Sequence, residues 1–335
     1  MNSVDFDEES SSFILSLGGF SYPFHYIPSR KDIWLNMKDE DFEVVLLNNP
    51  FLYKETDYFE LEFDGSGVRD GYIFPIALLE SEEDTDKILR SYMYVSYRIL
   101  LNGVTNSPTG VLSDSFKDAF VLVVNKRTKV DFCIENYILS LAGIGFYSYK
   151  GVITKTFPQL SYFKGMVKTL KLEQADVDNL RNGYVHNLIS EQLVRTSDFL
   201  TRFVLIYQVV ELYITEIHQR LLDEKIKAYQ NGKLKRNDFS VELINISKEA
   251  YQVEDLSKEY HQETVCLEYI KEVVGLFNDI GYDPKSKSIS ALLYALRNHI
   301  FHNYSIFVGH EEQLNDVIFR FERVILFILM KKMIK

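Results

Sequence analysis

The sequence predicts an α+β protein, in which an N-terminal mixed α/β domain precedes an all-helical C-terminal bundle. Short runs of β-branched and aromatic residues, separated by turn sequences, occupy much of the first 150 residues. From about residue 187 onward, apolar residues recur at three- and four-residue steps, which is the period of an amphipathic helix. A chain of 335 residues exceeds the size at which one core usually stops growing. We therefore expect two domains, at residues 1–172 and 173–335.

Four segments of the N-terminal domain have the composition of strands, and one has that of a helix. The capping-box sequence from Ser81 to Asp84 opens the predicted helix, which ends near Leu101. The predicted strands are Phe42–Leu47, Tyr58–Phe63, Tyr72–Leu78 and Phe120–Val124. These elements leave the topology of the domain open.

The C-terminal domain is predicted to contain four main helices. The first is apolar nearly all round between Phe203 and Ile214, which predicts a central, buried position. A basic loop, Asn231–Asn237, follows it. The predicted helices span residues 189–222, 256–277, 288–302 and 311–333, and the last carries a predicted buried stripe of Leu314, Val317, Ile318, Phe321, Ile325 and Leu329.

Charge is distributed unevenly along the chain. The net charge of −11 alone would argue against a nucleic-acid partner, because phosphate repels carboxylates. Residues 1–135, however, hold 24 acidic and 12 basic side chains, whereas residues 136–335 hold 24 acidic and 25 basic ones. The acidity thus belongs to the N-terminal domain, which we interpret as a sensor or regulatory domain.

A segment without acidic residues, 136–172, lies near the predicted domain boundary. Its lysines alternate with aromatic residues, a combination that suits a groove for single-stranded RNA. The alternative is a linker whose aromatic side chains pack inward and whose lysines are simply solvated. The candidate RNA contacts are Lys150, Lys155, Lys164 and Lys168.

The most informative motif is Arg297-Asn298 followed by His302, near the end of an otherwise apolar helix. Five residues along a helix correspond to a rotation of about 140°, so Arg297 and His302 do not share one stripe. Asn298 and His302 are four residues apart and do share one, so Asn298 is expected to orient the imidazole. His299 and His302 have metal-ligand spacing, but no cysteine or acidic ligand lies nearby in sequence, and we expect no metal.

This motif resembles the Arg-polar-(four to six residues)-His pattern of the HEPN superfamily, particularly of its bacterial Apea-like defence members. Phe203–Glu211 also resembles the first core helix of such bundles. The resemblance implies a metal-independent endoribonuclease that works as a homodimer without a cofactor, as a toxin or anti-phage effector. It implies that a ribose 2′-hydroxyl attacks the neighbouring phosphorus, which leaves 2′,3′-cyclic phosphate and 5′-hydroxyl ends. Arg297, Asn298 and His302 are then the catalytic candidates, and Glu211, His299 and Tyr304 the supporting ones.

Two further features accompany this motif. Glu211 is the only charge within its apolar run, and a buried carboxylate needs a partner, for which Arg297 is the obvious candidate. Arg181, Asn182 and His186 repeat the spacing of the motif, but a glycine lies between them. This second instance is either an accessory RNA-contact pair or a surface turn.

The remaining expectations concern location and partners. The N-terminus is acidic and lacks the order of a secretory signal, and no apolar run approaches the roughly 20 residues of a membrane span. With two cysteines there is no disulfide framework, so we expect a cytoplasmic protein. The expected partners are RNA, a second copy of the chain, and a trigger or antitoxin protein. The competing hypothesis is a non-catalytic HEPN binding or dimerisation module beside another enzyme.

Overall fold

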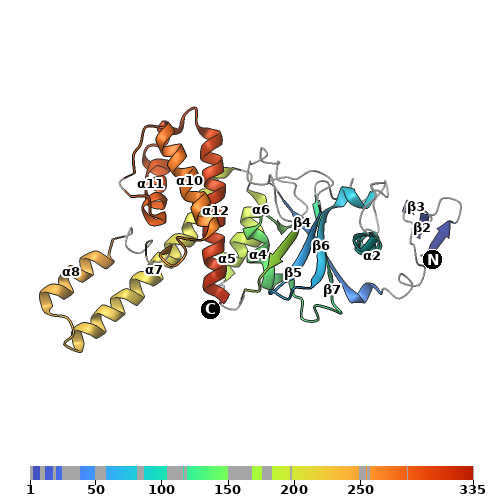
Figure 1. The fold of residues 1–335 in the computed structure, drawn as a ribbon, viewed down its shortest axis with the longest axis horizontal. Coiled ribbons are helices and arrows are strands. Elements are labelled where there is room, and N and C mark those ends of the chain that lie inside the picture. The colour runs from blue at the N-terminus through green and yellow to red at the C-terminus, as the bar shows by residue number, and fades with distance from the viewer. Residues whose placement is uncertain are drawn as a thin grey trace. The chain divides into compact units, whose positions relative to one another are not determined.

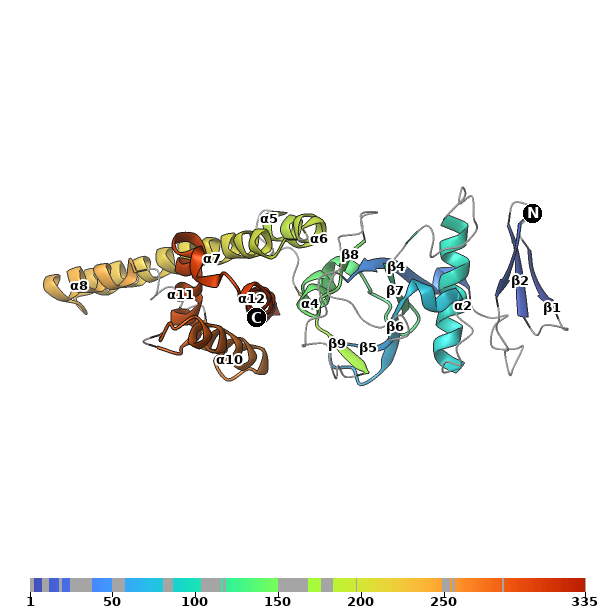
Figure 2. The ribbon, with the colours of Figure 1, turned by 90° about the horizontal axis from the view of Figure 1, so that it is seen from above.

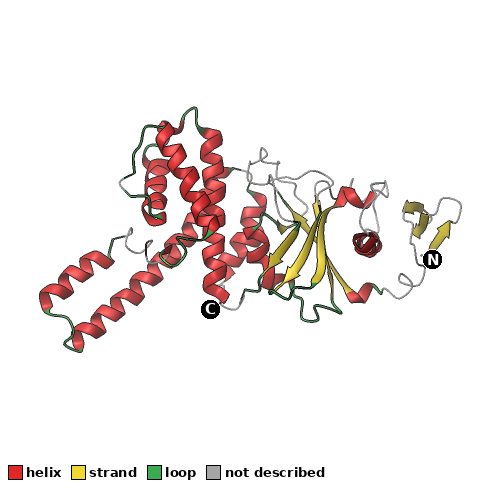
Figure 3. Cartoon of the chain, viewed as in Figure 1, coloured by secondary structure: helices red, strands yellow, loops and turns green. Residues whose placement is uncertain are grey.

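The chain consists of two compact units with different secondary structure (Figure 3). The computed structural model describes residues 3–7, 12–17, 20–24, 38–49, 58–80, 87–103, 116, 119–149, 168–175, 183–196, 198–248, 254, 257–284 and 286–334. The first unit comprises residues 1–141 and 145–174, and the second comprises 142–144 and 175–335. Strands dominate the first unit and helices the second, which confirms the predicted α+β class.

The first unit is built on a mixed six-stranded sheet of order β8-β4-β7-β6-β5-β9. All neighbouring strands are antiparallel except β5 and β9, which run parallel. The strands are β4 (Phe42–Asn48), β5 (Phe59–Phe63), β6 (Arg69–Pro75), β7 (Ala119–Asn125), β8 (Tyr147–Ser148) and β9 (Thr169–Leu172). A separate antiparallel sheet contains β1 (Ser3–Asp7), β2 (Ser12–Leu17) and β3 (Phe20–Phe24).

All four predicted strands are present, although one is shifted. The strand predicted at Tyr72–Leu78 begins at Arg69 and ends at Pro75, after which Ile76–Glu80 forms a 3₁₀ helix, η2. Proline lacks a backbone N–H and so cannot continue a central strand, which explains this end. Strands β8 and β9 were not predicted, because they are short and lie in the segment interpreted as a linker or RNA groove.

Both faces of the six-stranded sheet are buried. Helix α2 (Lys87–Gly103) packs on one face, where the Tyr92 ring lies 5.5 Å from Phe42 and 4.9 Å from Tyr72 (Figures 1 and 2). On the other face, Phe146 lies 6.1 Å from Phe59 and 5.2 Å from Phe120. Burial on both faces explains why β7 reads as an unbroken apolar run rather than an alternating one.

The second unit begins with a broken helix rather than the continuous one predicted for 189–222. Helix α5 (Tyr184–Asn187) continues through a π-helical turn, Leu188–Gln192, into α6 (Leu193–Arg195). The chain is extended at Thr196, and α7 (Phe199–Gln230) then starts anew. The reason is a capping signal that was missed: the Asp198 carboxylate accepts hydrogen bonds from the Thr201 amide at 2.7 Å and hydroxyl at 2.6 Å.

The remaining described helices follow α7 along the chain. They are α8 (Arg236–Ile246), α10 (Thr264–Asp279), α11 (Ile289–His302), the short η8 (Tyr304–Phe307) and α12 (Glu311–Ile334). Helix α12 packs against both α7 and α10, and its predicted buried stripe is confirmed. Helix α10 begins at Thr264, not near residue 256, and is followed by α11, which packs on it.

The prediction that α7 is buried all round is wrong on one side. Phe203, Ile206 and Tyr207 are fully buried, whereas Gln208 and Glu211 are exposed and Leu212 is 42% exposed. The run is apolar in composition, but the side that carries Gln208, Glu211 and Leu212 is exposed.

Helix α7 is 32 residues long, yet charged side chains recur along it. Within the ranges that the structure describes, no helix combines sufficient length and apolarity to cross a membrane.

The backbone at Gly71 sits too close to its neighbour strand for any side chain. A Cβ at this position would lie 2.3 Å from the carbonyl oxygen of Val123. Gly71 pairs with Val124 across the β6–β7 ladder, in the middle of the sheet, so neither strand can move aside freely.

We predict that Gly71→Ala lowers the free energy of unfolding by about 1–3 kcal/mol, the usual penalty for overpacking a core. Gly143→Ala is the control, since a Cβ there meets no atom within 4 Å. Urea unfolding followed by circular dichroism measures both. Equal midpoints for the two variants would contradict the close approach of β6 to β7.

Candidate functional site

Helix α11 carries the motif on its last two turns. Its first turn is capped by Ser288, whose hydroxyl accepts a hydrogen bond from the Ala291 amide at 3.3 Å. Leu292, Leu296 and Ile300 form its buried face. The helix ends at His302, where the N–H of Asn303 donates to the carbonyl of His299 at 2.9 Å.

The Arg297 guanidinium rests on aromatic rings. Its central carbon lies 5.9 Å from the ring centre of Tyr207 and 5.3 Å from that of Phe301, distances typical of cation–π contacts. Nη1 donates to the Asn298 side-chain oxygen at 3.1 Å. Nε is buried, and no side chain or carbonyl among the described residues accepts its proton. The arginine is thus held in place by Asn298 and the two rings.

His302 lies on the opposite side of an exposed aromatic stripe from Arg297. Tyr294 and Phe301, seven residues apart, share one face of α11 and are 37% and 47% exposed. By helical rotation, Arg297 lies about 60° to one side of Tyr294 and His302 about 80° to the other. His302 is itself exposed.

The expected role of Asn298 in orienting His302 is not what the structure shows. The Asn298 side-chain oxygen accepts from Arg297, its neighbour in sequence, instead. Throughout the described ranges, no hydrogen bond joins either Arg297 or Asn298 to the imidazole of His302. Arg297 and Asn298 are neighbours in the chain, so the guanidinium is close enough to take up this amide oxygen.

His299 occupies an aromatic environment. Its ring centre lies 4.5 Å from that of Tyr282, 5.7 Å from Phe277 and 6.3 Å from Phe307. Burial lowers the pKa of His299 below its usual range, so this imidazole is neutral near pH 7. His299 therefore packs rather than titrates at neutral pH. In the described part of the chain, no group of three or more His, Cys, Asp or Glu side chains could hold a metal ion.

Tyr304, the last supporting candidate, lies in the exposed turn after α11. It is 40% exposed and contacts Phe307 edge-on, with ring centres 6.1 Å apart. Val308, beyond it, is 70% exposed. The turn extends the apolar surface that Tyr294 and Phe301 begin.

Glu211 was expected to be a buried partner of Arg297, and this was wrong. Its side chain is exposed, because it lies on the uncovered side of α7. Its charge acts on Tyr184 instead: burial first, and then the Glu211 carboxylate, raise the pKa of the Tyr184 hydroxyl. No ion pair between Glu211 and Arg297 is present.

The buried ion pair of this unit lies elsewhere, between Arg202 and Glu322. Nε and Nη2 of Arg202 donate to the two carboxylate oxygens at 2.9 and 2.6 Å. Nη1 donates to the carbonyls of Leu193 and Thr196 at 2.6 and 3.1 Å, so it also caps the end of α6. The side chains are 0% and 2% exposed. A second pair, Arg320 with Glu268 at 3.1 Å, joins α12 to α10.

A sequence signal for this pair existed and was missed. Arg320, Glu322 and Arg323 interrupt the apolar stripe of the last helix. Charges within a buried stripe require opposite charges on the helices packed against it.

The second instance of the motif lies mostly outside the described residues, which exclude Arg181 and Asn182. His186 lies on α5, half-buried, and its carbonyl accepts a hydrogen bond from the Ser190 hydroxyl at 2.8 Å. That bond is local to its own helix, and it adds nothing to the α11 motif.

Among the candidate RNA-contact lysines, Lys150, Lys155 and Lys164 also lie outside the described residues. The fourth, Lys168, lies 4.7 Å above the Tyr58 ring and 4.0 Å from the Glu60 carboxylate. Its charge is therefore matched within the β5–β9 region of the sheet, which explains the lysine without RNA.

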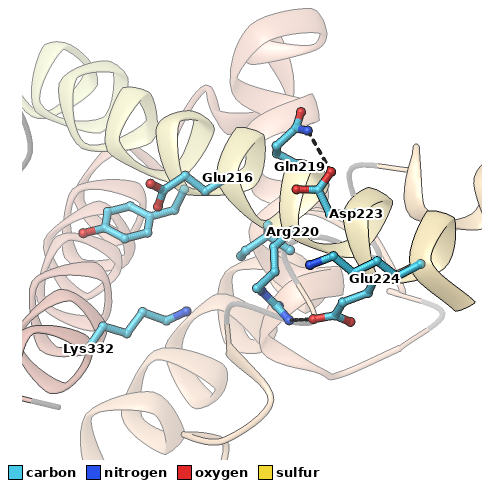
Figure 4. Close-up of a pocket in the computed structure, with 9 residues that line it drawn as sticks. Glu216, Gln219, Arg220, Asp223, Glu224 and Lys332 are labelled. Carbon is cyan, nitrogen blue, oxygen red and sulfur yellow. Dashed lines mark hydrogen bonds and ion pairs between the residues drawn. The ribbon is translucent and has the colours of Figure 1, made fainter.

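A hollow of about 670 Å³ lies between α7 and α12 (Figure 4). Arg220 pairs with Glu224 at 3.0 Å, and Gln219 donates to Asp223 at 3.3 Å. The ionisable side chains that line the hollow are those of Glu216, Asp223, Glu224, Arg220, Lys227 and Lys332. Positive and negative side chains balance here, so the hollow gives no net attraction for phosphate, and neither Arg297 nor His302 lines it.

We predict that Arg202→Met destabilises the helical unit by about 3–5 kcal/mol, because Glu322 is left as an unpaired buried charge. Adding Glu322→Leu should restore most of that loss, since no charge then remains buried. Arg195→Ala removes a surface ion pair with Glu191, in which the arginine side chain is 61% exposed, and should cost below about 1 kcal/mol. Chemical unfolding of the parent, these three variants and Glu322→Leu alone tests this, and additive effects of Arg202→Met and Glu322→Leu would contradict it.

Comparisons with models of protein families, with curated proteins and with solved structures found no match.

Proposed function

We propose that the helical unit is a HEPN-type endoribonuclease that cuts RNA at the α11 motif. The observation that carries the proposal is the Arg297 guanidinium, fixed on the rings of Tyr207 and Phe301, on the same helix as an exposed His302 that lies across the Tyr294–Phe301 stripe. A guanidinium held in this way suits the equatorial oxygens of a phosphate, which it can bind through two parallel hydrogen bonds.

The chemistry needs two copies of the chain. One histidine must remove the proton of the ribose 2′-hydroxyl, and a second must protonate the departing 5′-oxygen. A single copy supplies one exposed histidine on α11, since His299 is enclosed by aromatic rings. Two copies that meet through Tyr294 and Phe301 bring their His302 side chains to one groove, from opposite sides of the exposed stripe.

In this arrangement each group has a distinct role. The neutral His302 of one copy acts as the base, and the protonated His302 of the other acts as the acid. Arg297 stabilises the charge that develops on the phosphate. The products are a 2′,3′-cyclic phosphate and a 5′-hydroxyl, no metal takes part, and DNA is not cut because it lacks the attacking hydroxyl.

We further propose that the protein is a cytoplasmic toxin or anti-phage effector, whose first unit responds to a trigger or antitoxin protein. The excess of acidic residues in that part of the chain supports a role in restraining an RNA-binding unit.

A non-catalytic binding module remains the second candidate. The exposed stripe of Tyr294 and Phe301, together with Val308, favours it, because such a stripe also suits a protein partner without any chemistry. Among the described residues, neither Arg297 nor Asn298 forms a hydrogen bond with the imidazole of His302, and a binding module needs no such bond.

We predict that the purified protein cleaves single-stranded RNA in the presence of a chelator, and that His302→Ala and Arg297→Ala each lower the rate by at least about 100-fold. Arg297→Lys should also be impaired, because an ammonium cannot reproduce the planar pair of donors. Gel analysis of a labelled oligonucleotide, with chemical identification of both new ends, measures the effect.

Matched controls are His261→Ala and Arg195→Ala, which remove a histidine and an arginine outside α11 and should leave the rate unchanged. Cleavage that survives His302→Ala, or that requires a divalent metal ion, would contradict the nuclease proposal.

A further inference from the structure

The end of α7 and the whole of α8 form a helical hairpin, which we call the α7–α8 arm (residues 218–246). Figure 1 shows the arm extending away from α10, α11 and α12 of the same unit. At its base, a ring nitrogen of His218 lies 3.1 Å from the carbonyl oxygen of Ile246. Farther out, Lys225 pairs with Glu242 at 2.9 Å. These contacts tie the two helices together along their length.

Positive charge is concentrated at the tip of the arm. From Lys225 to Asn237 there are five basic residues and no acidic one. Lys227, Lys233, Lys235 and Arg236 are exposed, and no described carboxylate lies within ion-pair distance of any of them. Elsewhere in the unit, basic residues such as Arg195, Arg220 and Arg320 have acidic partners.

The turn that presents these charges is well defined. Gly232 adopts φ = +69°, a conformation that favours glycine, and its N–H donates to the Tyr229 carbonyl at 3.0 Å. The N–H of Lys233 donates to the Ala228 carbonyl at 2.9 Å. The side chains of the tip therefore project from a hydrogen-bonded turn.

An aromatic pair lies directly beside the basic residues. The rings of Tyr229 and Phe239 stack with centres 4.7 Å apart and planes 17° from parallel. This stack closes the tip of the arm, and Tyr229 is still 41% exposed. Positive charge next to an exposed ring is the combination that binds single-stranded nucleic acid, because phosphates meet the charges and a base stacks on the ring.

We propose that the tip of the α7–α8 arm is an RNA-binding surface, which holds a single strand whose other end reaches the α11 site. The inference deepens the proposed function, because it assigns where the substrate is held away from the cut. The exposed Tyr229 ring favours RNA over an acidic protein as the partner, because a base can stack on the ring whereas carboxylates need only the positive charges.

The distance between the α11 site and the tip of the arm sets a minimum length for an RNA that contacts both. Tyr229 lies 22 residues beyond Tyr207 on α7, which corresponds to about 33 Å at 1.5 Å per residue. A stacked strand advances about 3.4 Å per nucleotide, so about ten nucleotides are needed to span the distance. RNA shorter than this reaches the α11 site without touching the arm.

The test measures binding separately from cleavage, in a His302→Ala background. Fluorescence anisotropy is recorded for labelled single-stranded RNAs of 6 and 20 nucleotides over a series of salt concentrations. The arm variant is Lys233→Glu with Lys235→Glu. The control is Lys271→Glu with Lys287→Glu, which makes the same charge change at two exposed positions outside the arm.

The arm variant should bind the 20-nucleotide RNA at least tenfold more weakly than its parent. The slope of the logarithm of the binding constant against the logarithm of the salt concentration should be smaller by about 1.4, because two phosphate contacts are lost. Binding of the 6-nucleotide RNA should not change, and the control should match the parent. Tyr229→Leu should also weaken binding of the longer RNA, whereas Tyr229→Phe should not.

Unchanged affinity of the arm variant for the longer RNA would overturn the proposal, as would equal weakening by the control. Loss of binding to a polyglutamate peptide, with RNA binding intact, would also overturn it and would indicate an acidic protein partner. These outcomes are distinct from failure of the nuclease, since arm-dependent binding without His302-dependent cleavage would leave the arm correct and the nuclease wrong.

Discussion

Arg202 and Glu322 face each other inside the helical unit, almost completely removed from water. Neither charge could remain there alone, because an unpaired buried ion is far more costly than a solvated one. The bidentate geometry fixes the start of α7 against the middle of α12, and Nη1 fixes the end of α6 as well. This ion pair therefore fixes where α7 begins and how it aligns with α12.

The alignment reaches the site through aromatic rings. Phe203 and Phe321, the neighbours of the two ions in sequence, lie 4.8 Å apart. Phe203 stacks on Tyr207 at 5.7 Å, and Tyr207 in turn lies beneath the Arg297 guanidinium. A path of aromatic rings thus leads from the buried ions to a cation whose buried Nε meets no acceptor among the described residues. The partner proposed for that cation is a phosphate.

Periodicity and strand composition were sufficient to predict the α+β class, the four strands and the stripe of α12, because these depend on local pattern. They were insufficient for contacts between distant residues. The Arg202–Glu322 pair joins residues 120 positions apart, and the capping role of Asp198 was missed inside a helix that was predicted to be continuous. For the site, the motif predicted which residues share α11, but the exposure of Glu211 and the contact of Asn298 with Arg297 depend on which faces other helices cover.

The central claim is that one cut uses a His302 from each of two copies. Heterodimers of wild-type and His302→Ala subunits, purified through two different affinity tags, test it most directly. The account predicts cleavage nearly as slow as that of the His302→Ala homodimer, because either the acid or the base is missing from the shared groove. Half of the wild-type rate would contradict it, since each copy would then contain a complete site of its own.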